Sequence, residues 1–404
     1  MDTTCCIVGG GPAGMMLGLL LAKQGLDTYV LEKHADFFRD FRGDTIHPST
    51  LEIMYELGIL DKFLQLPHQK TTKLTGYIEN EMVTIADFSQ LQVQCPYIAF
   101  MPQWDFLNFI AATAKQYPNF HLLMETKATG LRIDNGVVTG VTAQTPNGVI
   151  QINSTLVVGA DGRDSIIRQS AGLKIQEIGA PMDVFWFRLS RKSTDPIDTF
   201  GKFSAGKIMI MINRNDYWQC GYVIAKGMAN TLKLQEIGYF KEQISKLLPF
   251  LDDRVQELKS WDEVKLLTVK IDRLKKWYMP GLLCIGDCAH AMSPVGGVGI
   301  NLAIQDAVAA ANIIATPLLQ KNINTEILAR VQKQRMLSTI LIQRIQIFIQ
   351  NRVIKSVLNE QRPIHVPFIL RKLQNTQFFK NIVGYIIGMG IAPEHVQSNK
   401  TKKI

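Results

Sequence analysis

The chain has 404 residues, of which 47% are hydrophobic and 20% charged, so it is long enough for two joined domains and has the composition of a globular enzyme. Its formal net charge of +9 is uneven: residues 351–404 hold nine Lys or Arg and two Glu, which places +7 there and leaves +2 for the first 350 residues. A nucleic-acid-binding domain would carry a basic stripe on a recognisable binding fold, and the sequence has neither.

The six cysteines argue against a disulfide framework or a metal centre. They form no Cys-x-x-Cys pair, and no Cys/His cluster has the spacing of a zinc site. This usage fits a reducing compartment. The first residues lack the pattern of a secretory signal, and no uninterrupted apolar run approaches the roughly 20 residues of a transmembrane helix. We therefore expect a cytoplasmic protein.

The first 32 residues predict a strand (Thr3–Val8), a glycine turn, a helix that ends at about Gln24 and a second strand (Thr28–Leu31). The turn fits G-x-G-x-x-G, in which the first glycine makes the bend, the second lets the backbone approach a pyrophosphate, and the third lets helix and strand pack. An acid at the end of the second strand suits a ribose hydroxyl and disfavours a 2′-phosphate, so the resident nucleotide is not NADP. The pattern alone does not separate NAD from FAD. The predicted binding residues here are Gly9, Gly11, Pro12, Ala13, Gly14, Glu32 and Lys33.

Further elements follow in chain order. Ser49-Thr50-Leu51-Glu52 predicts a capping box that begins a helix, and another helix is expected from Asp105 to Lys115. Residues 181–270 change to short aromatic and β-branched runs, which predict an antiparallel sheet. The expected strands, and the long apolar helix after them, are Val184–Leu189, Ile208–Ile212, Trp218–Ile224, Leu282–Ile285 and Asn301–Ile314.

Two more motifs accompany the glycine turn. One contains Asp161-Gly162-Arg163 and is followed by Arg168; the other is Gly286-Asp287-Cys288-Ala289-His290, which leads to Pro294. In this order the three motifs resemble those of the class A flavoprotein monooxygenases, the group of para-hydroxybenzoate hydroxylase and the ubiquinone-biosynthesis hydroxylases. The resemblance covers about residues 1–320, and it is specific for the superfamily rather than for a substrate.

The resemblance implies an α/β fold of the para-hydroxybenzoate hydroxylase type. A Rossmann-like FAD-binding domain (1–72, 98–180 and 268–320) would be interrupted by an antiparallel-sheet substrate domain (73–97 and 181–267) and followed by a helical C-terminal region (321–404). FAD would be held non-covalently, with its ribityl chain near Asp287 and its pyrophosphate near Asp161. Besides the residues of the glycine turn, the implied FAD contacts are Arg42, Gln103, Asp161, Gly162, Gly286, Asp287, Pro294, Gly297, Val298, Gly299, Ile300 and Asn301.

No catalytic acid or base is identified from the sequence. The expected neighbours of the flavin ring are Pro294, Gly296, Gly297 and His47. Glycines let backbone N–H groups approach a ring, and the helix expected to begin at Asn301 would point its positive end at the charge of a reduced flavin. Each polar motif residue also has a structural interpretation: Asp161 as part of a turn, Asp287 as a helix cap, His290 as a buried hydrogen-bonded side chain.

The family's chemistry is hydroxylation or epoxidation with O2. NAD(P)H would reduce FAD and leave, and a flavin C4a-hydroperoxide would then transfer its distal oxygen to an electron-rich ring or alkene. One dinucleotide fingerprint is visible rather than the two of a disulfide reductase, and no Trp-x-Trp-x-x-Pro motif indicates a halogenase. Two alternatives stay open: a flavin-dependent reductase or dehydrogenase of the same superfamily, and a non-catalytic carrier on the same fold.

The substrate pocket is expected between the antiparallel sheet and the flavin. Because strand residues alternate between faces, about half of the candidate walls must serve packing instead. The surplus of apolar residues suggests an apolar aromatic, polycyclic or prenylated small molecule. The candidate walls are Trp186, Arg188, Met209, Met211, Trp218 and Tyr222.

The C-terminal region mixes apolar clusters with Lys and Arg. One interpretation is a set of helices packed on the catalytic core. The other is peripheral contact between this basic tail and an anionic membrane surface, which basic amphipathic segments favour.

Overall fold

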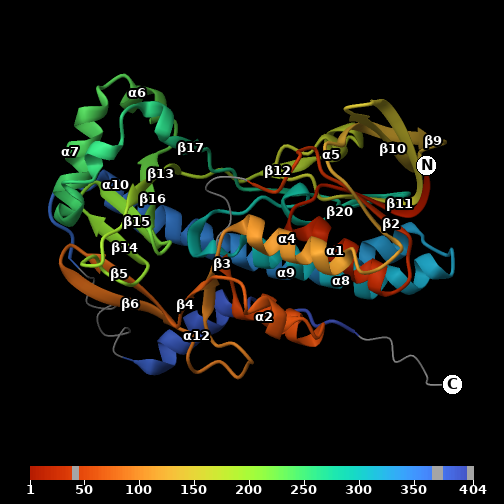
Figure 1. Ribbon diagram of the computed structural model, residues 1–404, viewed down its shortest axis with the longest axis horizontal. Helices are drawn as coiled ribbons and strands as arrows, with labels where there is room; N and C mark the ends of the chain where they lie inside the picture. The colour runs from red at the N-terminus through yellow and green to blue at the C-terminus, as the bar shows by residue number, and fades with distance from the viewer. Residues whose placement is uncertain (39–44, 366–375, 398–404) are drawn as a thin grey trace.

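The computed structural model describes residues 1–38, 45–365 and 376–397, and its two large sheets lie toward opposite ends of the long axis (Figure 1). In the eight-stranded sheet, a central β1 (Asp2–Val8) pairs in parallel with β2 (Thr28–Leu31) and β11 (Gly148–Gly159), in the order β19-β20-β11-β1-β2-β8. β9 and β10 extend β11 as an antiparallel pair. The other strands here are β8 (Phe120–Leu123), β9 (Lys127–Asp134), β10 (Val137–Thr145), β19 (Tyr278–Met279) and β20 (Leu282–Cys284).

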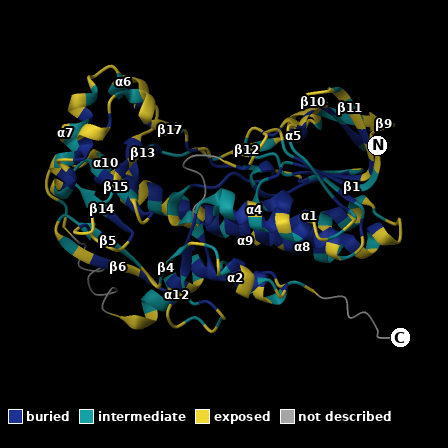
Figure 2. Ribbon diagram, viewed as in Figure 1, coloured by how far each residue is buried: buried dark blue, intermediate teal, exposed yellow. Residues whose placement is uncertain are grey.

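Side chains along β1 point alternately to the two faces of the sheet, and the two sets pack in different layers. Cys5 and Ile7 pack with α1, α4 and α8, whereas Cys6 and Val8 face the opposite side, toward β10 and α5. A parallel strand covered on both faces needs a continuous apolar run, which β1 provides. Figure 2 shows α1 and α8 largely buried against the sheet. The helices up to α8 are α1 (Pro12–Lys23), α2 (Pro48–Glu56), α3 (Leu60–Phe63), α4 (Gln103–Ala114), α5 (Ile166–Ser170), α6 (Ala229–Lys233), α7 (Ile237–Leu247) and α8 (Gly299–Leu319).

A seven-stranded sheet occupies the other end, in the order β17-β13-β16-β15-β14-β5-β6. The three strands expected between residues 181 and 225 are confirmed, each slightly longer than predicted, and β15 and β16 form a hairpin whose tip residue Asn215 has φ 65°. Asparagine tolerates this left-handed conformation. The strands are β5 (Lys73–Ile78), β6 (Glu81–Asp87), β13 (Met182–Ser190), β14 (Phe200–Ser204), β15 (Lys207–Asn213), β16 (Tyr217–Ala225) and β17 (Lys265–Leu267).

Two small sheets connect the two large ones. Three helices begin at residues other than those predicted. α2 begins at Pro48 with His47 as its N-cap and no side-chain cap bond, so the predicted capping box is wrong. Proline suits the first helical position because its missing N–H has no partner there anyway. α4 and α8 each begin two residues earlier than expected. The small sheets comprise β3 (Thr45–Ile46), β7 (Ile98–Phe100) and β4 (Gln69–Thr71), and β12 (Ile175–Glu177) with β18 (Asp272–Leu274).

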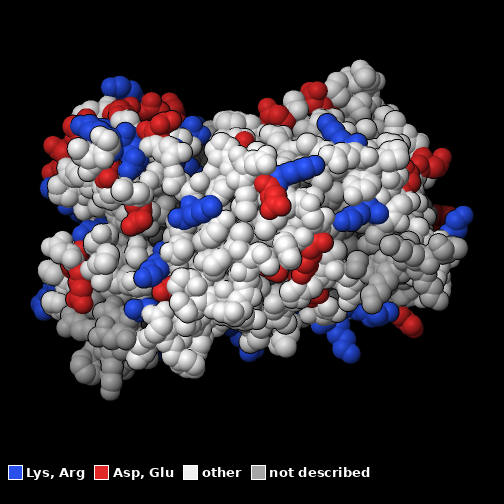
Figure 3. Space-filling view, turned by 60° about the horizontal axis from the view of Figure 1, so that its bottom comes forward, with Lys and Arg blue, Asp and Glu red and all other residues white. Residues whose placement is uncertain are grey.

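α8 is a core helix although its composition is that of a membrane span. In the described part of the chain, the segment Val295–Leu319 alone is long and apolar enough to cross a membrane. An 18-residue window of it has a mean hydropathy of 1.5, but 72% of that window is buried inside the protein. It lies against α1 and α9, which accounts for its apolar surface without a bilayer. On the face seen in Figure 3, Lys and Arg side chains are interspersed with Asp and Glu at the upper left and scattered among uncharged residues elsewhere.

The C-terminal helices pack on the rest of the molecule, as the first interpretation of this region expects. α12 lies across the end of β6, where a Cβ at Gly384 would come within 2.1 Å of the carbonyl oxygen of Asp87. The basic residues Arg371, Lys372, Lys400, Lys402 and Lys403 lie outside the described residues. The last elements are α9 (Thr325–Ile349), a π-helical turn (Gln350–Ile354), α10 (Lys355–Asn359) and α12 (Gln377–Gly388).

The close approach at Gly384 gives a test of this packing. We expect Gly384→Ala to lower the free energy of unfolding by about 1–3 kcal/mol, because an added methyl group meets backbone that cannot move aside. Gly238→Ala in α7 is the matched control, since a Cβ there meets nothing within 4 Å and alanine is the better helix former. Chemical denaturation measures both; equal effects would contradict the α12 contact.

Candidate active site

Three segments distant in sequence meet at the N-terminus of α1. A Cβ at Gly14 would lie 1.9 Å from the carbonyl oxygen of Gly9, and one at Gly9 would lie 2.3 Å from the carbonyl oxygen of Ala160. A Cβ at Gly286 would lie 3.1 Å from that of Ala13. Glycine at these positions therefore allows the Asp161-Gly162 and Gly286-Asp287 motifs to close onto the glycine turn.

The middle glycine of the turn faces open space. Apart from its own neighbours in the chain, no described residue places an atom within 4 Å of where a Cβ of Gly11 would be, and none of the described side chains caps the first turn of α1. Uncapped N–H groups at a helix N-terminus, next to a gap, form an anion site. Beside it, Glu32 Oε2 accepts a hydrogen bond from the N–H of Gly10 at 3.1 Å, while Lys33 is exposed. This cradle fits the pyrophosphate and adenosine half of FAD.

The two motif aspartates have different surroundings. The carboxylate of Asp161 accepts hydrogen bonds from Ser165 Oγ at 2.5 Å and from the N–H of Ile167 at 3.3 Å, so its side chain stabilises the start of α5. Its backbone alone borders the glycine turn. Asp287 is partly exposed and lies 3.5 Å from a guanidinium nitrogen of Arg163. It can therefore reach a ribityl hydroxyl without losing a buried partner.

The glycine-rich loop before α8 is held in a conformation that glycine requires. Gly296 and Gly297 have φ 80° and 64°, and the hydroxyl of Thr45 donates a hydrogen bond to the carbonyl oxygen of Gly297 at 2.8 Å. A Cβ at Gly297 would lie 2.6 Å from Thr45 Oγ1. Thr45 was not predicted as a site residue, and its position three residues after Arg42 is the signal that points to it.

Two helix N-termini converge beside this loop. Asn301, in the first turn of α8, accepts hydrogen bonds through Oδ1 from the N–H of His47 at 3.0 Å and from the hydroxyl of Thr50 at 2.7 Å. The start of α2 is thereby tied to the start of α8. Because each helix has a positive N-terminal end, this corner favours a ligand that gains negative charge, as a flavin does on reduction.

The sequence comparisons agree with this geometry. A family model described as an FAD binding domain matches residues 2–337. Over 359 residues the chain is 31% identical to 6-methylpretetramide 4-monooxygenase from Streptomyces rimosus, covering 88% of this chain and 85% of that enzyme. The chain belongs to the class A FAD-dependent monooxygenase family.

Other comparisons agree with the family and its fold. The solved structure of p-nitrophenol 4-monooxygenase from Pseudomonas putida matches with a TM-score of 0.75 and 18% identity, over 96% of this chain and 97% of that one, which confirms the para-hydroxybenzoate hydroxylase-like fold. A digeranylgeranylglycerophospholipid reductase from Thermoplasma volcanium is 25% identical over 81% of each chain. The protein is thus an FAD-dependent monooxygenase, and NAD(P)H and O2 are the usual co-substrates of its class.

The remaining FAD candidates of this monooxygenase stay predictions as individual contacts. Gln103 is the first residue of α4 and is half-buried, and Val298 to Asn301 form the start of α8. Pro294 immediately precedes the left-handed glycines. Arg42 lies outside the described residues.

Four of the six predicted substrate contacts need correction. They belong to the apolar core between the seven-stranded sheet and α7, together with Phe240 and Ile244. Trp218 is fully buried there and donates its indole N–H to Asp195 Oδ2 at 2.9 Å. Alternation sends these side chains to the helix-covered face, away from the glycine-rich loop. The four residues are Met209, Met211, Trp218 and Tyr222.

Trp186 lies on the opposite face of that sheet. It packs with Val295 of the glycine-rich loop in one cluster and with Phe100 and Ile387 in another. A Cβ at Gly221 would come within 3.0 Å of its indole ring, so the indole lies against bare backbone. Arg188 is on the same face but exposed, with its guanidinium 5.0 Å from the ring centroid of Tyr217. Gly221 is a glycine inside a strand, and in the sequence it was the unused signal that another group packs closely against this backbone.

His290 has the structural role that was one of its two interpretations. Its Nε2 lies 2.6 Å from Asp306 Oδ2, and both side chains are buried. Asp306 also accepts hydrogen bonds from the N–H of Gly286 and from Nε of Arg335, each at 3.0 Å. The predicted FAD motif is thereby anchored to α8 and α9 by a carboxylate that sequence reasoning missed. A charged residue, Asp306, in the otherwise apolar helix α8 was the available signal.

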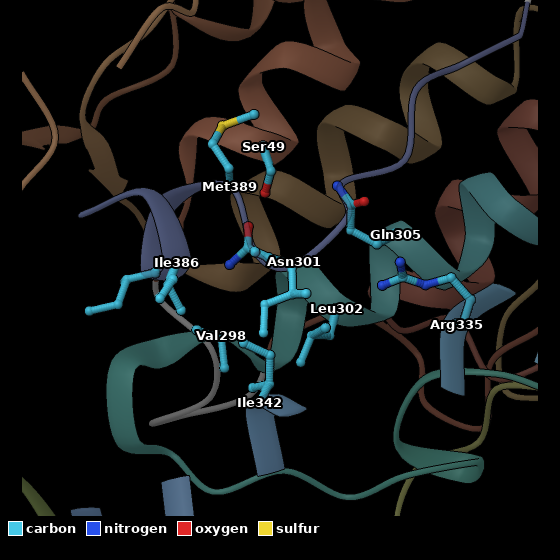
Figure 4. Close-up of a pocket in the computed structure, with 12 residues that line it drawn as sticks. Ser49, Val298, Asn301, Leu302, Gln305, Arg335, Ile342, Ile386 and Met389 are labelled. Atoms are coloured by element: carbon cyan, nitrogen blue, oxygen red, sulfur yellow. The ribbon is translucent and has the colours of Figure 1, made fainter. Parts of the chain in front are cut away.

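A small cavity lies beside the convergence of α2 and α8, and it is not a substrate pocket. It has a volume of about 20 Å³ and is bordered by Asn301, Gln305, Ile342 and Met389, as Figure 4 shows. The amide nitrogens of Asn301 and Gln305 are buried there without a partner among the described residues. Since one water needs roughly 10–15 Å³, this space suits a single bridging water rather than an aromatic ring.

His47 gives the site a pH dependence. Its Nδ1–H donates to the carbonyl oxygen of Ile387 at 2.7 Å, and its Nε2 is buried with no partner in the described part of the chain. Burial lowers the pKa of His47 from 6.5 to about 4, although the bond to Ile387 opposes this shift. Because the unfolded chain takes up the proton first, stability is complete above pH 6.5 and falls as the pH decreases toward 4.

We expect this loss to be about 3 kcal/mol of unfolding free energy, from a pKa difference of two to three units. The measurement is chemical denaturation at pH 7 and at pH 4.5 for the wild type and for His47→Gln, which cannot be protonated. The variant should lose less stability between the two pH values than the wild type does. Identical losses would show that His47 is not buried as a neutral side chain.

Proposed function

We propose that this enzyme acts in the cytoplasm and hydroxylates, or epoxidises, an apolar aromatic, polycyclic or prenylated small molecule. NAD(P)H would reduce the bound FAD, and FAD would supply the oxygen-transfer chemistry as its C4a-hydroperoxide. The observation that carries the proposal is the 31% identity with 6-methylpretetramide 4-monooxygenase over 85% of that enzyme's length. The protein's own groups would orient the ring and exclude water rather than serve as acid or base.

The residues support this role in four ways. The cradle at Gly11 fits the nucleotide half of FAD, and the corner between α2 and α8 favours the negative charge that reduction places on the flavin. Trp186 offers a flat apolar surface on the sheet face that packs with Val295. Gly296 and Gly297 leave backbone between this surface and α8 without side-chain bulk.

The decisive experiment combines cofactor consumption with isotope labelling. The flavin-loaded enzyme is tested against phenols, quinone precursors and polycyclic aromatics for accelerated NAD(P)H oxidation, and the products are analysed after reaction under ¹⁸O2. Incorporation of one labelled oxygen atom is the expected result. A reduced product without label would instead favour the reductase alternative. The similarity to a digeranylgeranylglycerophospholipid reductase is the observation behind that alternative.

The proposed contact between the substrate and Trp186, whose indole ring lies against the backbone of Gly221, can be tested separately. We expect Gly221→Val to raise the KM for an accepted aromatic substrate by about tenfold, because the new side chain displaces the indole, and a lost contact of about 1.4 kcal/mol has this effect. Flavin retention should not change. Met209→Leu on the other sheet face is a volume-conserving control that should leave KM unaltered. If KM shifts equally in both variants, Trp186 does not face the substrate.

A further inference from the structure

The helix α9 has the reverse of the usual polarity for a helix at the protein surface. Such a helix normally buries its apolar side and exposes its polar side. In α9, by contrast, Leu337 and Phe348 are each 63% exposed and Ile345 is 38% exposed. Its buried side is mainly polar and includes Arg335, Ser338, Thr339, Gln343 and Gln346.

The polar inner side is explained by its contacts. Gln343 Nε2 donates to the carbonyl oxygens of Asp272 at 2.9 Å and Ala291 at 3.2 Å. Gln346 Nε2 does the same for Ser293 at 3.0 Å and Val295 at 2.9 Å. These amides support the segment that leads into the glycine-rich loop. Among the described residues, the apolar outer side has no corresponding explanation.

The outer side of α9 also carries cations in the same stripe. From Ile327 to Asn359 the sequence contains no Asp or Glu. The positions 330, 333, 337, 344 and 348 share one side of a helix because they are spaced by three, four or seven residues. Arg335 is buried against Asp306, whereas the other Lys and Arg of this segment are exposed: Arg330, Lys333, Arg344, Arg352 and Lys355.

An open apolar groove adjoins the stripe. Its volume is about 460 Å³, and its lining includes Tyr278, Met336, Leu337 and Ile340, with Lys333 also at its wall. A further cation, Lys276, holds its Nζ 4.8 Å from the ring centroid of Tyr278. Apolar surface with ammonium groups around it suits a molecule that has both a hydrocarbon part and an anionic head.

We propose that the outer face of α9, with its adjoining groove, docks on an anionic lipid membrane. Leu and Phe side chains on this face can enter the boundary between headgroups and acyl chains, while Lys and Arg side chains extend to lipid phosphates. A symmetric pairing with a second copy is disfavoured, because it would bring the same cations face to face. The side chains chosen to test this surface, Lys333, Leu337, Arg344 and Phe348, all precede residue 351 in the sequence, and the proposal does not depend on the identity of the substrate.

The test is co-sedimentation of the full-length, flavin-loaded protein with vesicles of phosphatidylcholine, with and without phosphatidylglycerol. We expect about tenfold or more tighter binding to the anionic vesicles, decreasing as salt is added. Two α9 variants, Leu337→Gln with Phe348→Gln and Lys333→Gln with Arg344→Gln, should each reduce this binding about tenfold. All four side chains point outward, so circular dichroism should be unchanged.

Two control variants locate the effect. Ile197→Gln with Leu234→Gln removes side chains that are 76% and 87% exposed on other parts of the surface, and it should bind vesicles like the wild type. Replacing Lys400, Lys402 and Lys403 by Gln tests the tail separately. The proposal is overturned if the wild type ignores anionic vesicles, or if the tail variant alone loses binding. It is also overturned if light scattering shows a dimer that the Leu337 and Phe348 changes dissociate.

Discussion

Replacing Gly11 by Asp is expected to abolish FAD binding while leaving the protein folded. Aspartate is a favoured N-cap residue and interacts well with a helix N-terminus, so α1 should be as stable as before or more so. Its carboxylate would nevertheless fill the open space beside Gly11 and repel the pyrophosphate. Two unit charges about 4 Å apart interact by about 4 kcal/mol in a partly solvated site, which corresponds to roughly a thousandfold loss of affinity.

The measurements are the flavin absorbance of the purified protein, FAD titration of the apoprotein, and thermal unfolding of the apoprotein. Gly238→Asp adds the same charge to the first turn of α7, where a Cβ meets nothing within 4 Å, and it should keep FAD. Gly14→Ala should behave differently from both, since its Cβ would clash with Gly9 and destabilise the apoprotein itself. If Gly11→Asp retained FAD at normal affinity, the phosphates would have to lie elsewhere.

The βαβ unit could be predicted because its determinants are local. The bend at Gly9, the helix start at Pro12 and the acid at Glu32 each act within one short segment, and the strands β1 and β2 agree with prediction to within a residue. The antiparallel strands were equally accessible, since β-branched and aromatic runs with a polar hairpin between them specify their own pairing. The family motifs then supplied the order of the parts.

Which side of the antiparallel sheet points toward the glycine-rich loop could not be predicted, because both sides of its strands are apolar. Met209 and Ile210 are equally plausible wall residues from the sequence, and alternation fixes only that they point opposite ways. The choice is made by α7, which packs on the side of Met209 and leaves Ile210 toward Val295. This contact joins segments whose sequences carry no shared pattern.

The start of α2 and the ties at Asn301 were also beyond a local interpretation. A capping box at Ser49 is a sound local pattern, but the proline before it begins the helix earlier. Asn301 was expected to begin α8. It lies instead in the first turn of α8, and its side-chain oxygen accepts a hydrogen bond from the N–H of His47 at the start of α2. Such long-range polar contacts depend on the assembled fold, and they are concentrated around the glycine-rich loop before α8.

The contacts of Asp306 likewise depend on the assembled fold. Its replacement should have the largest effect on stability. This fully buried carboxylate bonds to His290, Arg335 and the N–H of Gly286. Burial alone would raise the pKa of Asp306, but His290 and Arg335 outweigh it and keep that pKa below its usual value. The stabilisation is therefore present above the ordinary aspartate pKa and is lost as the pH falls through the lowered one.

We expect Asp306→Ala to lower the free energy of unfolding by about 3–5 kcal/mol, because it leaves the buried charge of Arg335 without its main partner. Asp27→Ala is the matched control: Asp27 also lies 3.0 Å from a histidine nitrogen, that of His121, but the pair is at the surface and should contribute about 1 kcal/mol or less. Denaturant unfolding measures both. Asp306→Asn, which keeps the shape, should in addition weaken FAD binding, since Gly286 then loses a charged acceptor. Equal, small effects of the two alanine variants would mean that the buried carboxylate does not hold the FAD motif in place.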